Sequence, residues 1–241
     1  MWVVQGEDIV VKGSFGGSKP ILKKVSFALE EGRVTLFIGK SGSGKTTLLR
    51  SIVGLNVVDS GNIIVRDKQR VGFVSQSYDL FSHMTVLKNC VHPQIKVKNE
   101  NYDMAVDKAM EFLKFLEIED LVDCYPDSLS GGQRQRVAIA RTLSMDSKIV
   151  LFDEPTAALD PYATEAFADL VKHIVSHGVT VGMSVHDMLL VNMCLDTVYL
   201  LDNGRIVDHF SVDDCGQPAP DSLIHQYLNK GDRSPSSENF N

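Results

Sequence analysis

The spacing of apolar positions predicts short strands along most of the chain. Residues 25–29 alternate between apolar and polar side chains, as in a strand with one buried face, and residues 34–38 form a continuous apolar run typical of a strand buried on both faces. Asn203 and Gly204 predict a tight hairpin turn. Further candidate strands of similar length are 61–65, 71–75, 149–152 and 180–185.

Helical periodicity separates several of these strands. Residues 45–53 favour a helix that follows the strand 34–38 after a glycine-rich segment, and Gly54 supplies a stop signal. Apolar residues recur at helical spacing over 163–174, between the last two candidate strands, and again over 105–116. A strand, a helix and a second strand in this order form a β-α-β unit. The pattern therefore predicts an α/β fold with a parallel core sheet.

Length and composition indicate one globular domain. A chain of 241 residues is long enough for one large buried core and too short for two ordinary domains with a linker. We expect this domain to span residues 1–230, and we expect the polar residues 231–241 to form a disordered tail. Hydrophobic residues make up 44% and charged residues 23% of the chain, close to the average of globular proteins, which excludes a fibrous or wholly disordered protein.

Charge, cysteine spacing and hydropathy exclude several other classes. The formal net charge of -7 argues against broad binding to nucleic-acid backbones, so no nucleic acid is expected as a partner. The cysteines are scattered without a C-x-x-C pair, which favours reduced thiols over a zinc site. The sequence contains neither a signal-peptide pattern nor an apolar window of ~18 residues. If the protein serves a membrane, other chains must therefore span it. The cysteines are Cys90, Cys124, Cys194 and Cys215.

A glycine-rich loop after the strand 34–38 matches the phosphate-loop pattern G-x-x-x-x-G-K-[ST]. Glycines in such a loop let backbone N–H groups surround phosphates at the start of a helix. Lys45 would reach the β- and γ-phosphates of a nucleotide, and the Thr46 hydroxyl would ligate Mg²⁺. The alternative is an ordinary Gly/Ser turn. The predicted nucleotide-binding residues of this loop are Gly39, Lys40, Ser41, Gly42, Ser43, Gly44, Lys45 and Thr46.

Two adjacent carboxylates end the candidate strand 149–152. Because side chains alternate along a strand, Asp153 and Glu154 would point in different directions and can take different roles. Asp153 would hold the hydration shell of Mg²⁺, and Glu154 would polarise the attacking water. The alternative is a solvated strand end, but the phosphate loop upstream favours the catalytic interpretation.

A second candidate anion site begins at the sequence L-S-G-G-Q, residues 129–133. Ser130 is a good helix N-cap, and the glycines that follow let backbone N–H groups approach an anion closely. A nucleotide already held by the phosphate loop leaves little room for this element in the same subunit, so we expect a dimer with the nucleotide between subunits. The alternative is a plain helix cap. The predicted nucleotide-binding residues here are Ser130, Gly131, Gly132 and Gln133.

The phosphate loop, L-S-G-G-Q and the sequence D-E-P at 153–155 occur in the order found in ATPases of the ABC transporter family, which this chain resembles from roughly residue 3 to residue 210. The resemblance implies a P-loop NTPase core with a parallel sheet, an N-terminal antiparallel β region and a helical subdomain at about 77–145. It also implies ATP and Mg²⁺ as cofactors, hydrolysis of ATP, and a homodimer with ATP between its subunits.

Five positions take a role only from this resemblance. Gln76 resembles the glutamine that contacts Mg²⁺ or water and senses the membrane partner. His186 resembles the switch histidine at the γ-phosphate, although a lone histidine at a strand end is often plain surface. Asp160 resembles the interface residue near the partner's phosphate loop; the alternative is a helix cap. Phe15 stands where the family has an aromatic ring that stacks on adenine; the alternative is a core residue. Thr47 completes the nucleotide-binding set. The predicted catalytic residues are Glu154, His186, Gln76 and Lys45, and the predicted metal ligands are Thr46, Gln76 and Asp153.

Spacing within the family favours a transporter. About 80 residues separate the phosphate loop from L-S-G-G-Q, too few for the long insertions of chromosome-organising and DNA-repair relatives. Residues 95–98 and 125–141 resemble the polar-amino-acid uptake branch of bacterial importers. The resemblance implies permease subunits in the membrane, an extracytoplasmic solute-binding protein as an indirect partner, and a peripheral position on the cytoplasmic face of the inner membrane. The alternative is an ABC ATPase that transports nothing, either a cell-envelope or cell-division regulator or a soluble iron–sulfur cluster assembly factor.

One surface segment is a candidate docking site for the permease. It lies between residues 76 and 128 and includes the apolar residues Leu80, Phe81 and Met84. Apolar residues of this kind are more often part of the core, so both interpretations stay open.

Overall fold

The computed structural model describes residues 1–13, 19–157 and 159–230 of the 241-residue chain. The chain forms two compact units: Met1–Lys68 with Asp153–Asn241 is unit 1, and Gln69–Phe152 is unit 2. Phe15 and the predicted tail lie outside the described residues. Within the described part, no helix is long and apolar enough to cross a bilayer.

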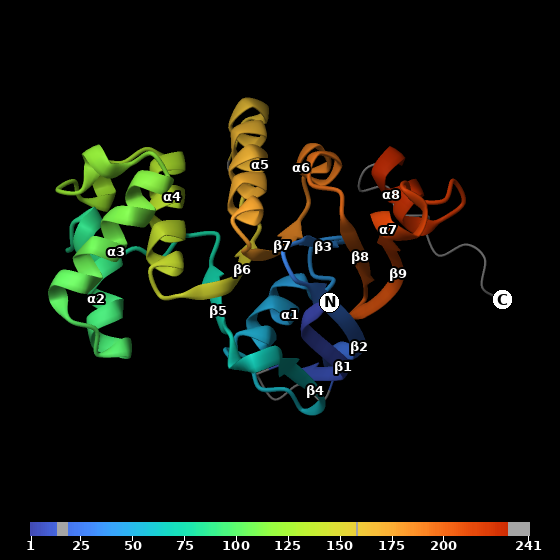
Figure 1. The fold of residues 1–241 in the computed structure, drawn as a ribbon. Coiled ribbons are helices and arrows are strands. Elements are labelled where there is room, and N and C mark those ends of the chain that lie inside the picture. Colours follow the sequence, from blue (N-terminus) through green and yellow to red (C-terminus); the bar gives the residue numbers. More distant parts are fainter. Residues whose placement is uncertain (14–18, 158, 231–241) are drawn as a thin grey trace. The chain divides into compact units, whose positions relative to one another are not determined.

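An antiparallel sheet forms one part of unit 1. Its strands are β1 (Trp2–Lys12), β2 (Pro20–Glu30) and β4 (Ser60–Val65), in the order β2-β1-β4. The predicted alternation over residues 25–29 is present in β2, where Val25, Phe27 and Leu29 are buried. The three strands lie side by side in Figure 1. The expected N-terminal antiparallel β region is thereby confirmed.

A second group of strands carries the core of unit 1. The strand β3 (Val34–Ile38) pairs in parallel with β7 (Thr180–Val185) and with β8 (Thr197–Asp202). The last strand, β9 (Arg205–Ser211), returns antiparallel to β8 through the predicted hairpin, where Asn203 and Gly204 both have positive φ. Every residue of β3 and β7 is buried, including the polar residues Thr35, Thr180 and Ser184, which agrees with strands covered on both faces.

The helices of unit 1 follow the predicted periodicity in two places. Helix α1 (Lys45–Ile52) starts directly after the glycine-rich loop, and α5 (Pro161–Ser176) covers the predicted 163–174. The shorter elements of this unit are the 3-10 turn Arg66–Lys68 and the helices α6 (Met188–Met193), α7 (Val212–Cys215) and α8 (Leu223–Lys230).

Unit 2 combines two strands with a helical bundle. The strands β5 (Arg70–Val74) and β6 (Ser147–Asp153) pair in parallel. Helices α2 (Val86–Lys98), α3 (Tyr102–Phe115) and α4 (Gly131–Leu143) pack against one another, as Figure 1 shows. Short 3-10 turns at Glu119–Leu121 and Pro126–Ser128 connect α3 to α4. The predicted α/β class with a parallel core and a helical region is confirmed.

Candidate nucleotide site

The glycine-rich loop connects β3 to α1 as predicted. Gly39 has φ 141°, and a Cβ atom at this position would overlap the carbonyl oxygen of Leu201. Gly44 is the N-cap of α1 with φ 111°. Both positions therefore require glycine, and a glycine N-cap leaves the first N–H groups of α1 without a side-chain cap. Such N–H groups form a site for an anion.

Lys45 extends back along this loop. Its side-chain Nζ atom donates hydrogen bonds to the carbonyl oxygens of Gly39 at 2.8 Å and Lys40 at 3.2 Å. The same Nζ lies 2.9 Å from Nε2 of His186. Lys45 is only 3% exposed, so its charge is held inside the loop and does not point into solvent. A buried ammonium ion in a ring of backbone groups is suited to neutralise phosphate oxygens.

Thr46 and Asp153 meet although 107 positions separate them in the sequence. The Thr46 hydroxyl donates to Asp153 Oδ1 at 2.8 Å. A second hydroxyl, that of Ser184 on β7, donates to the same oxygen at 2.7 Å. Asp153 is 6% exposed, and these two hydrogen bonds stabilise its Oδ1 atom in a buried position.

Glu154 follows Asp153 in a strained backbone conformation. Its φ is 49°, in the left-handed region that few residues with a side chain adopt. Its backbone N–H donates to Ser184 Oγ at 2.9 Å, and its side-chain Oε1 lies 2.8 Å from Nε2 of His186. The arrangement turns the Glu154 carboxylate toward His186 while Asp153 faces Thr46. The predicted division of direction between the two acids is therefore present in the structure.

A cavity of about 280 Å³ adjoins this cluster. The Glu154 side chain is 27% exposed and the His186 side chain 33%, so both remain accessible to water. Asp187 is the N-cap of α6 and also accepts a hydrogen bond from Thr164 Oγ1 at 3.1 Å. The cavity is lined by Glu154, Thr156, Ala157, His186 and Asp187.

Asp160 is a helix cap in this structure. Its Oδ1 accepts a hydrogen bond from the backbone N–H of Ala163 at 2.8 Å, and Pro161 takes the first position of α5. This geometry agrees with the capping interpretation. It leaves the second interpretation, a contact with the partner's phosphate loop, as a prediction.

The signature segment, residues 129–133 with the sequence L-S-G-G-Q, lies at the start of α4 in unit 2. The Ser130 hydroxyl accepts a hydrogen bond from the Gln133 N–H at 3.3 Å, and the Gln133 side chain accepts one from the Ser130 N–H at 2.9 Å, which forms a capping box. A Cβ atom on Gly131 or Gly132 would meet nothing within 4 Å. The space around this helix start therefore does not require glycine. A ligand that must approach the backbone closely would require it.

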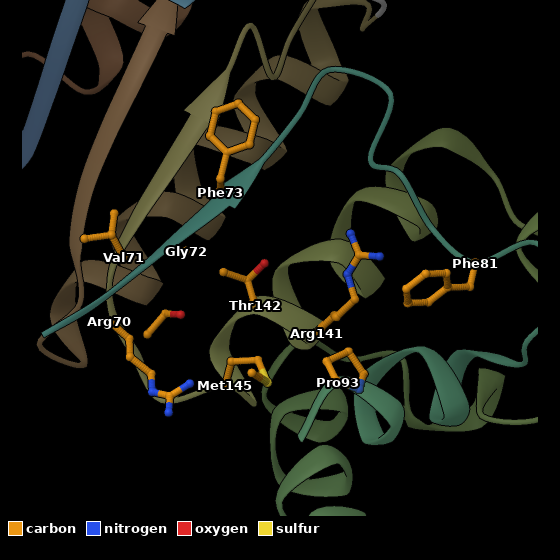
Figure 2. A pocket seen from close by; sticks show the side chains of 10 residues that line it. Arg70, Val71, Gly72, Phe73, Phe81, Pro93, Arg141, Thr142 and Met145 are labelled. Atoms are coloured by element: carbon orange, nitrogen blue, oxygen red, sulfur yellow. The ribbon is translucent and has the colours of Figure 1, made fainter. Parts of the chain in front are cut away.

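Gln76 lies in unit 2, in the exposed turn after β5. Arg141 on α4 donates hydrogen bonds to the carbonyl oxygens of Tyr78 and Asp79, both at 2.7 Å. Its guanidinium carbon lies 5.8 Å from the centre of the Phe81 ring, and Figure 2 shows the two side chains next to each other. The turn that carries Gln76 is thus tied to the same helix that begins with the signature segment.

A surface hollow of about 430 Å³ lies beside this turn in unit 2. Phe81 is 38% exposed, and Leu80 and Met84 are half-buried. The buried Asn89 side chain fixes this segment, because its amide accepts a hydrogen bond from the Phe81 N–H at 2.8 Å and donates to the carbonyl oxygens of Phe81 and Met84, both at 3.1 Å. The residues around the hollow, most of them labelled in Figure 2, are Arg70, Val71, Gly72, Phe73, Phe81, Pro93, Arg141, Thr142, Met145 and Ser147.

The structure thus brings one group of predicted residues together in unit 1: Lys45, Thr46, Asp153, Glu154 and His186. Gln76 and residues 130–133 belong to unit 2. Sequence reasoning missed Ser184, which contacts both acids. A polar residue in the apolar run 181–185 was the available signal.

Comparisons with known proteins identify the family to which this chain is similar. The family described as ABC transporter matches residues 22–157. The chain is 38% identical over 205 residues to the glutamine transport ATP-binding protein GlnQ of Geobacillus stearothermophilus, which covers 80% of this chain and 85% of the relative. It is 36% identical over 229 residues to the arginine transport ATP-binding protein ArtP of Haemophilus influenzae, with 88% and 94% covered. A dimeric ATP-binding cassette in a post-hydrolysis state, bound to ADP and phosphate, has a TM-score of 0.75 at 29% identity, with 87% of this chain and 98% of that chain covered.

Proposed function

This chain belongs to the ABC transporter family, and we propose that it is the subunit that binds and hydrolyses ATP to drive uptake of a polar amino acid. The observation that carries the proposal is the cluster in unit 1, where contacts of 2.8 to 2.9 Å join Lys45 and Glu154 to His186, and Thr46 to Asp153. These residue types supply what phosphoryl transfer to water requires: a cation for phosphate, oxygen ligands for a metal, and a base for water.

The phosphate loop supports binding of the ATP phosphates. The first N–H groups of α1 and the Lys45 ammonium supply positive potential at one place. The hydroxyl oxygen of Ser43 is buried and has no hydrogen-bond partner among the described residues, so a phosphate oxygen can satisfy it. Thr47 lies one position further along α1 and stays a prediction, as does stacking of adenine on Phe15.

The donor set also fits Mg²⁺. Thr46 Oγ1 and Asp153 Oδ1 are oxygen atoms 2.8 Å apart beside the phosphate loop, and hard oxygen donors are what Mg²⁺ selects. Thr46 and Asp153 would hold the ion directly or through water, and the role of Gln76 as a metal ligand stays a prediction. When bound, Mg²⁺ supplies positive charge to the phosphate oxygens.

Glu154 is the proposed general base. A water molecule held by its carboxylate attacks the γ-phosphorus atom, the bond from that atom to the β–γ bridging oxygen breaks, and ADP leaves as inorganic phosphate forms. The water proton passes to the Glu154 carboxylate. Nε2 of His186 lies 2.8 Å from Oε1 of Glu154 and 2.9 Å from Nζ of Lys45. When this nitrogen carries a proton, it donates to the carboxylate and fixes its direction; when it does not, it accepts from Lys45 instead.

The signature segment supports a homodimer with ATP between the subunits. Gly131 and Gly132 are exposed at the start of α4, and nothing within 4 Å of either Cβ position explains the absence of a side chain. A phosphate group of ATP held by another copy would use this free approach to the backbone. Opening and closing of such a dimer would follow the nucleotide cycle.

The hollow around Phe81 is the proposed docking site for a permease subunit in the membrane. Phe81 is partly exposed, although apolar, and its backbone is fixed by Asn89. A fixed apolar residue in a hollow is a suitable anchor for a partner side chain. Through the permease, the chain would lie on the cytoplasmic face of the membrane and act indirectly with an extracytoplasmic solute-binding protein. The amino-acid transport proteins among its relatives favour this role over that of a regulator or soluble assembly factor.

Reconstitution with copurified membrane partners tests the proposal. Phe81→Glu should abolish amino-acid uptake into vesicles and leave the ATPase activity of the isolated chain unchanged. Val97→Glu is the matched control, because Val97 is an apolar residue of unit 2 that is 65% exposed and does not line the hollow. It should retain both activities. If Phe81→Glu lost both the ATPase activity of the isolated chain and its stability, Phe81 would be a core residue. Copurification of the wild type with a soluble scaffold instead of membrane proteins would refute the transport role.

A further inference from the structure

Ser184 is a polar residue in a strand that is otherwise suited to apolar side chains. All of β7 is buried, and Ser184 itself is 0% exposed. It pairs with Phe37 of β3, and its neighbours in the strand are Met183 and Val185. A hydroxyl in such a place destabilises the fold unless it forms hydrogen bonds. The partners it has therefore explain its presence.

Both partners of the Ser184 hydroxyl belong to the proposed catalytic acids. Its single proton is donated to Asp153 Oδ1 at 2.7 Å, and its oxygen accepts the Glu154 N–H at 2.9 Å. A hydroxyl can donate one hydrogen bond and accept others at the same time, so these two contacts are compatible. One buried side chain thus joins the carboxylate of one acid to the backbone of the next.

The contact with Glu154 acts on a strained residue. Glu154 has φ 49°, and its N–H is directed at two acceptors of the same residue, Ser184 Oγ at 2.9 Å and the Ser184 carbonyl oxygen at 3.2 Å. A backbone in this region persists when surrounding contacts hold it there. This backbone directs the Glu154 carboxylate toward His186, so the Ser184 hydroxyl contributes to the orientation of the proposed general base.

The contact with Asp153 differs from that of Thr46. Both hydroxyls donate to Oδ1, but Thr46 is itself a proposed ligand of Mg²⁺, a role that competes with its hydrogen bond to Asp153. Ser184 lies on β7 outside the phosphate loop and has no competing role. Its hydrogen bond can hold the Asp153 carboxylate in one orientation while the contacts of Thr46 change.

We propose that Ser184 is a positioning residue that holds the Asp153 carboxylate and the Glu154 backbone in the geometry required for hydrolysis. It touches neither nucleotide nor metal and acts through the two acids. The inference rests on the proposed ATPase function, since it assigns Ser184 a part in that reaction.

Steady-state kinetics of three proteins test the assignment: wild type, Ser184→Ala and Ser184→Thr. Removal of the hydroxyl should lower kcat about ten-fold, and a ten-fold change is about 1.4 kcal/mol, the scale of one hydrogen bond to a charged group. KM for ATP should stay within about two-fold of the wild-type value, because the nucleotide contacts of the phosphate loop remain. Ser184→Thr keeps the hydroxyl and should restore most of kcat. A purely structural role would change stability without this rescue.

Metal affinity gives a readout that is independent of turnover. Binding of Mn²⁺ to the ADP-loaded protein, followed by electron paramagnetic resonance, should weaken several-fold in Ser184→Ala and recover in Ser184→Thr. Ser51→Ala is the matched control, since Ser51 is 4% exposed and its hydroxyl donates to the Thr47 carbonyl oxygen at 2.8 Å, away from both acids. Its kcat and Mn²⁺ affinity should match the wild type.

Wild-type kcat and Mn²⁺ affinity in Ser184→Ala would overturn the inference. Equal loss in the alanine and threonine variants, with a lowered midpoint of thermal unfolding in both, would overturn it as well and identify a packing role. If the wild type itself did not hydrolyse ATP, the proposed function would fail, and the Mn²⁺ affinities would still decide whether Ser184 positions Asp153.

Discussion

Replacement of Arg141 by alanine is expected to release the turn that carries Gln76. The Arg141 side chain connects α4 to this turn through hydrogen bonds of 2.7 Å to the carbonyl oxygens of Tyr78 and Asp79 and through the Phe81 ring 5.8 Å away. Without it, the turn loses two donors and the ring loses its cation. The change therefore tests whether the signature helix holds the turn in place.

The magnitude follows from these contacts. A hydrogen bond from a charged donor contributes about 1.5–3 kcal/mol, and a cation beside an aromatic ring contributes about 0.5–1 kcal/mol at an exposed site. Two effects reduce the total. Tyr78 is half-buried and Asp79 exposed, so water replaces part of the lost bonding, and burial lowers the pKa of Arg141, which shows that its charge is partly desolvated in the fold. We expect a loss of about 2 kcal/mol in the free energy of unfolding.

Urea denaturation of the nucleotide-free protein measures this loss. Arg134→Ala is the matched control, because Arg134 lies on the same helix, is exposed, and donates one hydrogen bond of 3.1 Å to the Leu129 carbonyl oxygen. Its loss should stay near 0.5 kcal/mol, as for other surface substitutions. Equal midpoints for Arg141→Ala and Arg134→Ala would refute the reasoning. Faster amide exchange at Tyr78 in Arg141→Ala should accompany the lost stability.

Three further predictions concern other parts of the chain. Gly39→Ala should abolish binding of a fluorescent ATP analogue, because φ 141° is strained for alanine and the alanine Cβ would overlap the Leu201 carbonyl oxygen. Unchanged affinity for the analogue would contradict this prediction. Burial raises the pKa of Cys90 to about 12, so mass spectrometry should find it unmodified by iodoacetamide near pH 8 until the protein unfolds, and rapid labelling of the native protein would refute its burial. Burial opposes ionisation of Asp146, but hydrogen bonds from Lys108 and Lys98 outweigh it and lower the pKa of the Asp146 carboxyl. The stability that this lowered pKa contributes is present above the ordinary carboxyl pKa and is lost as pH falls through the lowered value. Asp146→Asn should therefore reduce the free energy of unfolding by about 1 kcal/mol at neutral pH and by progressively less in acid. A difference in urea denaturation that does not change with pH would be the contrary result.

The strands were predictable where burial on both faces leaves an unbroken apolar run. The bounds of β3 and β7 agree with the sequence prediction, because all residues of both strands are buried and most of them are apolar. Helix α2 was not predicted. Its buried side includes the polar residues Asn89 and Gln94, and Pro93 lies inside it, so the apolar period that identifies a helix is weak.

The candidate site residues are easiest to predict where a motif is continuous in sequence. The phosphate loop and the pair Asp153 and Glu154 are such motifs, and the structure brings Thr46 of the loop into contact with Asp153. Ser184 lies 31 positions from Asp153, and no local pattern in the sequence indicates that their side chains form a hydrogen bond. Similarly, the sequence left Phe81 open between core and surface, and its 38% exposure is a property of the packed helices.

The most direct test of the central claim is ATP turnover and size-exclusion chromatography of wild type and Glu154→Gln with Mg²⁺ and ATP. The substitution keeps the size of the side chain and removes the base, so it should stop hydrolysis without preventing nucleotide binding. We expect a hydrolysing wild type beside an inactive variant that accumulates as an ATP-bound dimer. Unchanged turnover in Glu154→Gln would show that Glu154 is not the catalytic carboxylate and would contradict the proposed site.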